Sequence, residues 1–234
     1  MDASAYALTH GLKRTRVTLE RWRRRPWPVL RAWVAGSLAV AVGLLLATWA
    51  VSLIATTDSA GLILSPPLVV GGPRDVIRIL GHNLVVLAFH AMACVAGFIA
   101  GSSLPLQAPA HSGFKRWVHE RGRPVALAFV VLATIFSLST QALVLGMSAA
   151  RVASSLHASS ALLLAGLMPH AVPELTALFL PLAAWMVASR RGQWEQLLAA
   201  TFVTTALAVP VLVLASLWEV YGAPHLLQAL LGYR

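Results

Sequence analysis

Residues 168–189 read MPHAVPELTALFLPLAAWMVAS, a stretch that is apolar and long enough to enter a lipid bilayer. Near its start it carries His170 and Glu174, four residues apart, and Arg190 and Arg191 follow it directly. Ionisable side chains are costly inside a membrane, so those within an apolar segment indicate a functional site. The stretch therefore predicts a membrane-spanning helix with a polar site at one end.

The composition of the whole chain is that of a membrane protein. Of its 234 residues, 58% are hydrophobic and 11% are charged, whereas about a quarter of the residues of a typical soluble domain are charged. The formal net charge is +10, but the basic residues cluster between apolar runs, which argues against nucleic acid as a partner. Cys94 is the single cysteine, so any bound metal would need His, Asp, Glu or Asn ligands.

Five apolar segments meet or approach the length of about 20 residues that a spanning helix needs. They are residues 32–55, 76–100, 125–149, 171–188 and 197–217. A shorter run, residues 158–168, is too brief to cross alone, and we expect it to form a re-entrant or interfacial helix that leads into Pro169. The sequence thus predicts an all-α polytopic transmembrane bundle at residues 32–234, preceded by a basic cytoplasmic tail at residues 1–31.

The basic residues orient this bundle, because cytoplasmic loops carry an excess of lysine and arginine. With five spans, fourteen of the eighteen basic residues fall on the side of the N-terminus: Lys13, Arg14, Arg16, Arg21, Arg23, Arg24, Arg25, Arg31, Lys115, Arg116, Arg121, Arg123, Arg190 and Arg191. The other four are Arg74, Arg78, Arg151 and Arg234. We therefore expect a multi-pass protein of the cell membrane, with a cytoplasmic N-terminus and an extracytoplasmic C-terminus, whose tail contacts anionic lipid of the bilayer.

A six-span arrangement is the alternative. If residues 158–168 and the run after them formed two spans, Arg190 and Arg191 would lie outside. The charge distribution favours five spans over this arrangement.

Polar residues of four predicted helices fall close to the outer side of the membrane. They are His82, Asn83, Gln141, His170, Glu174 and Glu219. At about 1.5 Å of rise per residue, each lies within roughly 15 Å of the outer boundary. We expect these side chains to share one polar cavity.

One imidazole and two carboxylates would suit a site for zinc or another divalent metal, with one position left for water. In this hypothesis His170, Glu174 and Glu219 bind the metal or divide between ligand and general base. The supporting polar residues would be His82, Asn83 and Gln141. A structural interpretation stays open, in which these groups cap a helix or hydrogen-bond between helices.

The order of these elements is similar to that of the stage II sporulation protein M (SpoIIM) family. The elements are GHNLVV (residues 81–86), TQALVLG (140–146), MPHAVPEL (168–175) and LWEVYGAPHL (217–226), and the resemblance covers about residues 75–225. It implies a multi-pass membrane protein that takes part in sporulation engulfment beside peptidoglycan-degrading partners. Relatives accompany the maturation and export of circular bacteriocins, which favours a peptide or envelope substrate over a small metabolite.

Three functions are compatible with these observations. The first is a membrane-embedded, metal-dependent peptidase or other hydrolase; the second is a non-enzymatic scaffold of an envelope-remodelling or peptide maturation and export complex. A transporter is less favoured, because His90 is the one polar candidate in the inner half of the membrane. Whether the chain is an enzyme therefore stays open. A homodimer is a further expectation, since the small residues Gly97 and Gly101 could support helix pairing.

Overall fold

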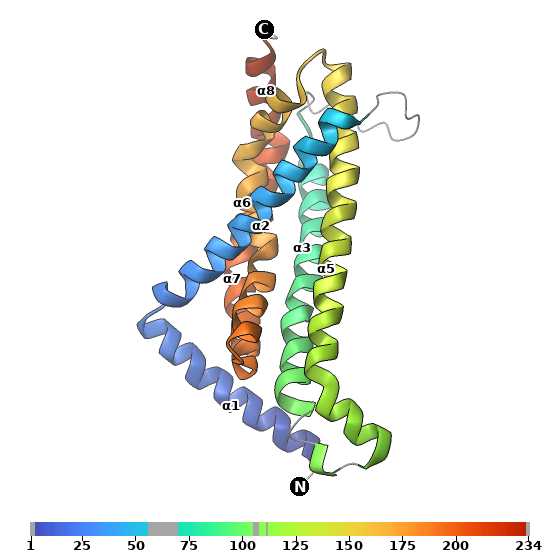
Figure 1. The fold of residues 1–234 in the computed structure, drawn as a ribbon. Coiled ribbons are helices and arrows are strands. Elements are labelled where there is room, and N and C mark those ends of the chain that lie inside the picture. The colour runs from blue at the N-terminus through green and yellow to red at the C-terminus, as the bar shows by residue number, and fades with distance from the viewer. Residues whose placement is uncertain (1–2, 56–69, 105–107, 111, 233–234) are drawn as a thin grey trace. The chain divides into compact units, whose positions relative to one another are not determined.

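The computed structural model of the chain describes residues 3–55, 70–104, 108–110 and 112–232, which are helical almost throughout and contain no strand (Figure 1). The long helices are α1 (Ala3–Arg24), α2 (Trp27–Ile54), α3 (Pro73–Phe98), α5 (Gly113–Ser155), α6 (Ser160–Arg190), α7 (Leu197–Leu217) and α8 (Ala223–Leu231). Short helical turns are η1 (Ile99–Ser103), η2 (Ala108–Ala110), η3 (Trp194–Gln196) and η4 (Trp218–Gly222). The predicted all-α class is confirmed. Arg234 lies outside the described residues.

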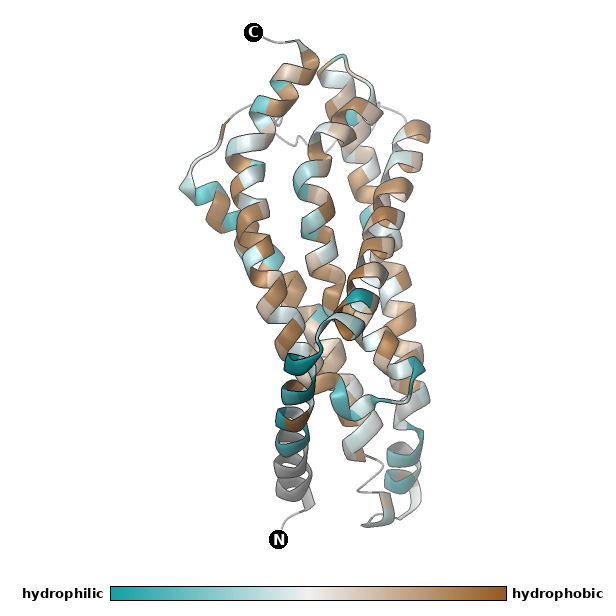
Figure 2. Ribbon diagram, turned by 90° about the vertical axis from the view of Figure 1, so that its left-hand side faces the viewer, coloured by the Kyte–Doolittle hydropathy of each residue, from teal (hydrophilic) through white to brown (hydrophobic). Residues whose placement is uncertain are grey.

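Five helical stretches of the described residues are long and apolar enough to cross a membrane: Trp27–Ile54, Pro73–Ser102, Pro124–Ser155, Ser160–Arg190 and Trp194–Leu231. Each overlaps one of the five segments predicted from the sequence. Figure 2 shows hydrophilic residues gathered in α1 and hydrophobic residues along the spanning helices. The chain is therefore a multi-pass membrane protein.

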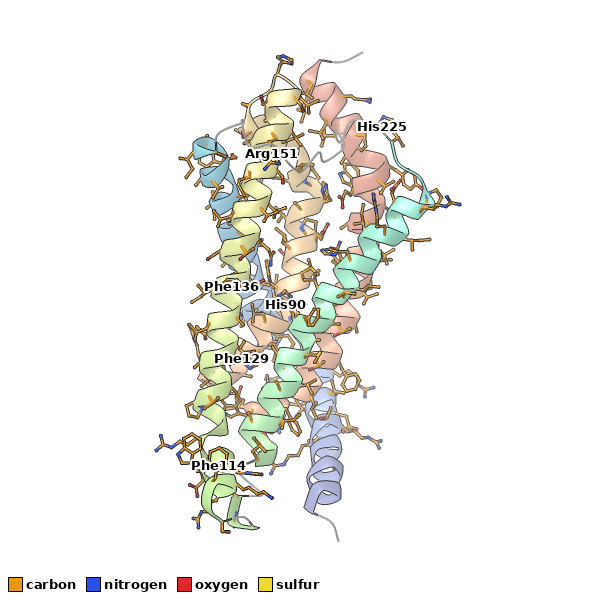
Figure 3. All side chains as sticks on the ribbon, turned by 90° about the vertical axis from the view of Figure 1, so that its right-hand side faces the viewer. His90, Phe114, Phe129, Phe136, Arg151 and His225 are labelled. Atoms are coloured by element: carbon orange, nitrogen blue, oxygen red, sulfur yellow. The ribbon has the colours of Figure 1, made fainter. Side chains whose placement is uncertain are left out.

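The spanning helices differ in how much of each is covered by the rest of the protein. In the apolar window of α6, 56% of the residues are buried, against 11% in the window of α5. Phe129 and Phe136 lie seven residues apart on α5 and are 71% and 74% exposed (Figure 3). Because such side chains would be poorly solvated by water, this surface of α5 is suited to contact with lipid.

The expected re-entrant or interfacial helix at residues 158–168 is not observed. Residues 160–168 are the first turns of α6, which continues through Pro169 and Pro173 to Arg190. The helix begins here because the hydroxyl of Ser159 accepts a hydrogen bond from the backbone N–H of Leu162, at 3.2 Å, which is an N-cap. The prediction was wrong because it took Pro169 as a boundary, whereas prolines are tolerated inside transmembrane helices.

The continuity of α6 also decides between five and six spans. Its 31 residues form one helix, which at about 1.5 Å per residue is long enough for one crossing but not for two. The six-span alternative is thereby removed.

The helices fall into two compact units, and each is described by itself. The first unit comprises residues 1–37, 86–133 and 178–208, and the second comprises residues 38–85, 134–177 and 209–234. The predicted tail, residues 1–31, lies in the first unit, where it forms α1 and the first turn of α2. The break between these helices follows from Pro26, because a proline disfavours helical geometry at the residue before it.

The first unit is held together by aromatic and small residues. Trp33, Leu180, Ala184 and Ala200 form a buried cluster, against which Trp22 packs. Two glycines of the second chain segment of this unit, residues 86–133, allow close contact with indole rings. A Cβ on Gly97 would lie 2.7 Å from Nε1 of Trp185, and one on Gly101 would overlap the ring of Trp194. These glycines, expected to pair helices of two copies, therefore pack against tryptophans of their own chain.

The second unit has its own apolar cluster, formed by Ala153, Leu156, Leu163 and Leu227. Close packing in this unit again depends on a glycine, because a Cβ on Gly146 would lie 2.5 Å from Cβ of Val51. This packing brings parts of α2, α3, α5, α6, α7 and α8 into one unit. The unit contains all six residues predicted to form the polar site.

Candidate functional site

A hydrogen bond between two spanning helices is the centre of the candidate polar site. Asn83 of α3 is 5% exposed, and its Nδ2 donates to Oε1 of Glu174 of α6 at 2.9 Å. The two residues are 91 positions apart in the sequence, so the bond is a product of the fold. Hydrogen bonds between membrane helices contribute about 1 kcal/mol each. This bond fixes the position of one carboxylate oxygen and leaves Oε2 available to other donors.

His170 lies one helical turn before Glu174. Because α6 is continuous through both residues, their side chains share one face of the helix, as side chains at positions i and i+4 do. The imidazole is 6% exposed, and its Nδ1 is buried without a hydrogen-bond partner among the described residues. Buried polar atoms are hydrogen-bonded in the great majority of cases. The described residues therefore leave the hydrogen-bonding capacity of this nitrogen unused.

Glu219 joins this region from η4, a π-helical turn between α7 and α8. Its side chain is half-buried, and its charge is close enough to interact with those of Glu174 and Arg78. Single π-helical turns occur frequently at functional sites, where they reposition a side chain within a helix. We define the candidate polar site as Asn83, His170 and Glu174, with Glu219 at its edge.

His82 and Gln141 are placed differently. His82 is exposed, since successive residues of a helix point about 100° apart and its neighbour Asn83 is the buried one. Gln141 donates from Nε2 to Oγ of Ser137, at 2.9 Å, one turn earlier on the same helix. Of the six predicted residues, the fold joins Asn83 and Glu174 by a hydrogen bond, places His170 one turn before Glu174, and brings the charge of Glu219 near that of Glu174.

Arg78 also lies in this region. From the sequence it was used only to orient the protein in the membrane and was not predicted to be part of the site. It lies on α3, where its Nη2 donates to Oδ1 of Asp75 at 2.9 Å, and its charge reaches Glu219. The signal was present in the sequence, because an arginine in the first turns of an apolar segment is itself an ionisable group in a membrane protein.

His90 belongs to the first unit (Figure 3). Its ring packs against that of Phe179, with 5.4 Å between the centroids. His90 therefore packs against an aromatic ring of its own unit.

The donor atoms of the candidate polar site are one imidazole nitrogen and one carboxylate, with a second carboxylate at its edge. Among the residues that the structure describes, no three His, Cys, Asp or Glu side chains form a group that could hold a metal ion. The groups that are in contact can accept and donate hydrogen bonds in a region of low dielectric, where each such bond is strong.

The comparisons with known proteins bear on the C-terminal part of the chain. The family model "Stage II sporulation protein M" matches residues 122–224. No curated protein and no solved structure matches the chain. The matched segment is shorter than the predicted resemblance over residues 75–225; it includes Glu174 and Glu219, whereas Asn83 precedes it. The order of the sequence elements and the family model agree, and residues 122–224 of this membrane protein are similar to the SpoIIM family.

Proposed function

We propose that this SpoIIM-like protein is a non-enzymatic scaffold that binds a polypeptide segment of an envelope or export partner within the membrane. The observation that carries the proposal is the buried, unpaired Nδ1 of His170, one turn from a carboxylate that Asn83 holds in place. A polypeptide inside a bilayer must satisfy its backbone N–H and C=O groups. Nδ1 of His170 and Oε2 of Glu174 are groups that could satisfy them.

Binding requires only the side chains that the fold already brings together. The amide of Asn83 orients Glu174, and α6 places His170 beside it. A bound segment would supply hydrogen-bond partners that the protein itself does not provide to Nδ1. The SpoIIM resemblance supports a peptide or envelope protein as the partner.

A metal-dependent hydrolase is the second candidate. It is favoured by the placement of two potential ligands, His170 and Glu174, on one helix face, with Glu219 on a π-helical turn within range of the charge of Glu174. Zinc or another divalent cation held by these residues would polarise a scissile carbonyl and activate a water molecule. This function requires Glu219 to approach the other two more closely, whereas binding does not.

We also propose that the protein resides in the cell membrane with a cytoplasmic N-terminus, so that the candidate polar site faces the outer leaflet. The charge distribution and the single crossing of α6 support this orientation. In a Cys94→Ala background, a membrane-impermeant maleimide should label His157→Cys in intact cells but not Ser112→Cys. The reverse pattern would overturn the orientation.

Binding and hydrolysis can be separated with one designed probe. The probe is a fluorescent Leu/Ala peptide of about 20 residues with a central proline, which spans a bilayer and leaves backbone groups unpaired. An uninterrupted peptide of the same length is the matched probe. The purified full-length protein in nanodiscs should bind the interrupted peptide more tightly and release it uncleaved.

The variants sharpen this test. His170→Ala should weaken binding of the interrupted peptide by about fivefold, the equivalent of one hydrogen bond, whereas the exposed His82→Ala should not change it. Glu174→Gln keeps an acceptor oxygen for Asn83 but replaces the free Oε2 by an amide donor, so it should also weaken binding by about fivefold. Cleavage of the peptide, with stoichiometric zinc that is lost in both His170→Ala and Glu174→Gln, would replace the scaffold by the hydrolase. Equal binding of both peptides, with no cleavage of either, would overturn both functions of the site.

A further inference from the structure

The first unit contains a cavity of about 470 Å³ that the proposed function does not use. Its walls come from the end of α1, the start of α2, the end of α6, the η3 turn and the start of α7. Four of the residues that line it are arginines, namely Arg21, Arg24, Arg25 and Arg191. We call it the arginine cavity. Its described lining contains no acidic residue.

The arginines of this cavity have no acidic partner within the described part of the chain. The acidic residue of η3, Glu195, is paired with Arg14, which does not line the cavity. The remaining ion pairs of the described residues are Arg16–Glu20, Arg78–Asp75 and Arg116–Glu120. Four like charges around one cavity repel one another and create a positive potential that attracts an anion.

A smaller, apolar cavity of about 210 Å³ adjoins the arginine cavity. The two share Trp22, Val29 and Trp33 as lining residues. The rings of Trp22 and Trp33 meet edge to face, with 5.1 Å between their centroids. Leu19, Leu30 and Val203 extend the lining of the smaller cavity. A ligand that filled both cavities would need an anionic part and an apolar part.

The chain segments that form these cavities lie at ends of spanning helices. Arg21 and Arg24 precede the first span, and Arg191 directly follows the fourth. Tryptophan is enriched at membrane–water interfaces, where its ring is apolar and its N–H is polar. Basic pockets between transmembrane helices are suited to the phosphates of lipid head groups.

We propose that the two cavities bind an anionic phospholipid, with its phosphate among the four arginines and its apolar part along Trp22 and Trp33. Arginine suits this role because its planar guanidinium can donate two hydrogen bonds to one phosphate. A soluble phosphate shares this chemistry but has no part to fill the apolar cavity. The site is independent of the peptide-binding function proposed for the second unit.

A specific binding site requires particular arginines, whereas general attraction of a basic tail to an anionic membrane requires only positive charge. Arg190 and Arg191 are neighbours with the same charge and are both exposed, but only Arg191 lines the cavity. General attraction would use both equally. The pair therefore provides a matched control at one point of the chain.

The test is a titration of the delipidated full-length protein in detergent, followed by native mass spectrometry. Phosphatidylglycerol and phosphatidylcholine of the same acyl composition are the probes. Arg191→Gln and Arg24→Gln should each weaken phosphatidylglycerol binding by about tenfold, the loss of a charge-assisted hydrogen bond to the phosphate. Arg190→Gln and Arg31→Gln should weaken it by less than about twofold, and phosphatidylcholine binding should stay unchanged.

Two outcomes would overturn the proposal. Equal losses for Arg190→Gln and Arg191→Gln would mean that the tail and helix ends attract anionic lipid without a site. Displacement of phosphatidylglycerol by inorganic phosphate or glycerol 3-phosphate at equal concentration would mean that the ligand is a free phosphate. Thermal unfolding of each lipid-free variant checks its fold, and Arg191→Lys, which keeps the charge but not the paired donors, should lose less affinity than Arg191→Gln.

Discussion

The candidate polar site and the arginine cavity differ in whether their charged groups have hydrogen-bond or ion-pair partners within the protein. In the second unit, the carboxylate of Glu174 is held by the amide of Asn83, so that the protein supplies most of its own partners. In the first unit, four arginines line a cavity whose described lining includes no carboxylate. A buried pair contributes to the fold and leaves few atoms for a ligand, whereas exposed arginines without an acidic partner remain available to an anion, whose binding would stabilise the folded state.

The largest effect is expected where a partner is removed from the candidate polar site. Asn83→Leu takes away the donor to Glu174 and leaves a carboxylate unsatisfied, so it should lower the free energy of unfolding by about 1–3 kcal/mol. The matched control is His82→Leu, one position earlier on α3, where an exposed imidazole is replaced and no hydrogen bond of the described residues is lost. Reversible unfolding in mixed micelles measures both variants. Equal stability of the two would show that the Asn83–Glu174 bond does not stabilise the fold.

A smaller effect is expected when the carboxylate itself is changed. Glu174→Gln keeps an oxygen that accepts from Asn83 and should change the free energy of unfolding by less than about 1 kcal/mol, whereas Glu174→Leu leaves the buried amide unpaired and should cost about 1–2 kcal/mol. The same unfolding measurement compares the two. A glutamine variant as unstable as the leucine variant would mean that charge, and not hydrogen bonding, stabilises this position.

The convergence of polar residues in the second unit could be predicted only in part. Counting residues from the ends of the apolar segments predicted that Asn83, His170 and Glu174 lie close together, and all three lie in the second unit. It did not give the rotation of each helix about its axis. For that reason Gln141, at a similar depth, was expected in the cavity but bonds Ser137 on its own helix. Rotation is decided by packing such as that of Gly146 against Val51, which periodicity does not reveal.

The arginine cavity could not be predicted for a different reason. Hydropathy and charge bias predicted that the tail and Arg191 lie on one side of the membrane. Their charges were therefore interpreted only as a signal of membrane orientation. Their association depends on α1 packing against the ends of α6 and α7 around Trp22 and Trp33. Residues 21 and 191 are far apart in the sequence, and no local pattern in either segment predicts that the two segments lie together.

The start of α6 was mispredicted although its signal is local. Ser159 precedes an apolar run and caps it, whereas Pro169 was taken as the boundary. Ser159→Ala should therefore lower the free energy of unfolding by about 0.5–1 kcal/mol, the usual cost of a lost N-cap. Ser154→Ala is the control, because Ser154 is exposed and its side chain makes no hydrogen bond among the described residues. Hydrogen exchange at Leu162 should increase in Ser159→Ala alone. Unchanged exchange there would mean that packing against Leu227, and not the cap, holds the first turn.

The smallest effect on the free energy of unfolding is expected in the arginine cavity. Its sign tells whether the arginines there already have partners within the protein. In lipid-free detergent, Arg191→Gln removes one of several like charges and no ion pair of the described residues. The free energy of unfolding should stay constant or rise by up to about 0.5 kcal/mol, because exposed charges interact weakly and their repulsion is screened. With saturating phosphatidylglycerol the order should reverse, since ligand binding stabilises the wild type more than the variant. A lipid-free variant that is clearly less stable than the wild type would show that Arg191 has a structural partner and that the cavity, like the site around Glu174, already satisfies its own charges.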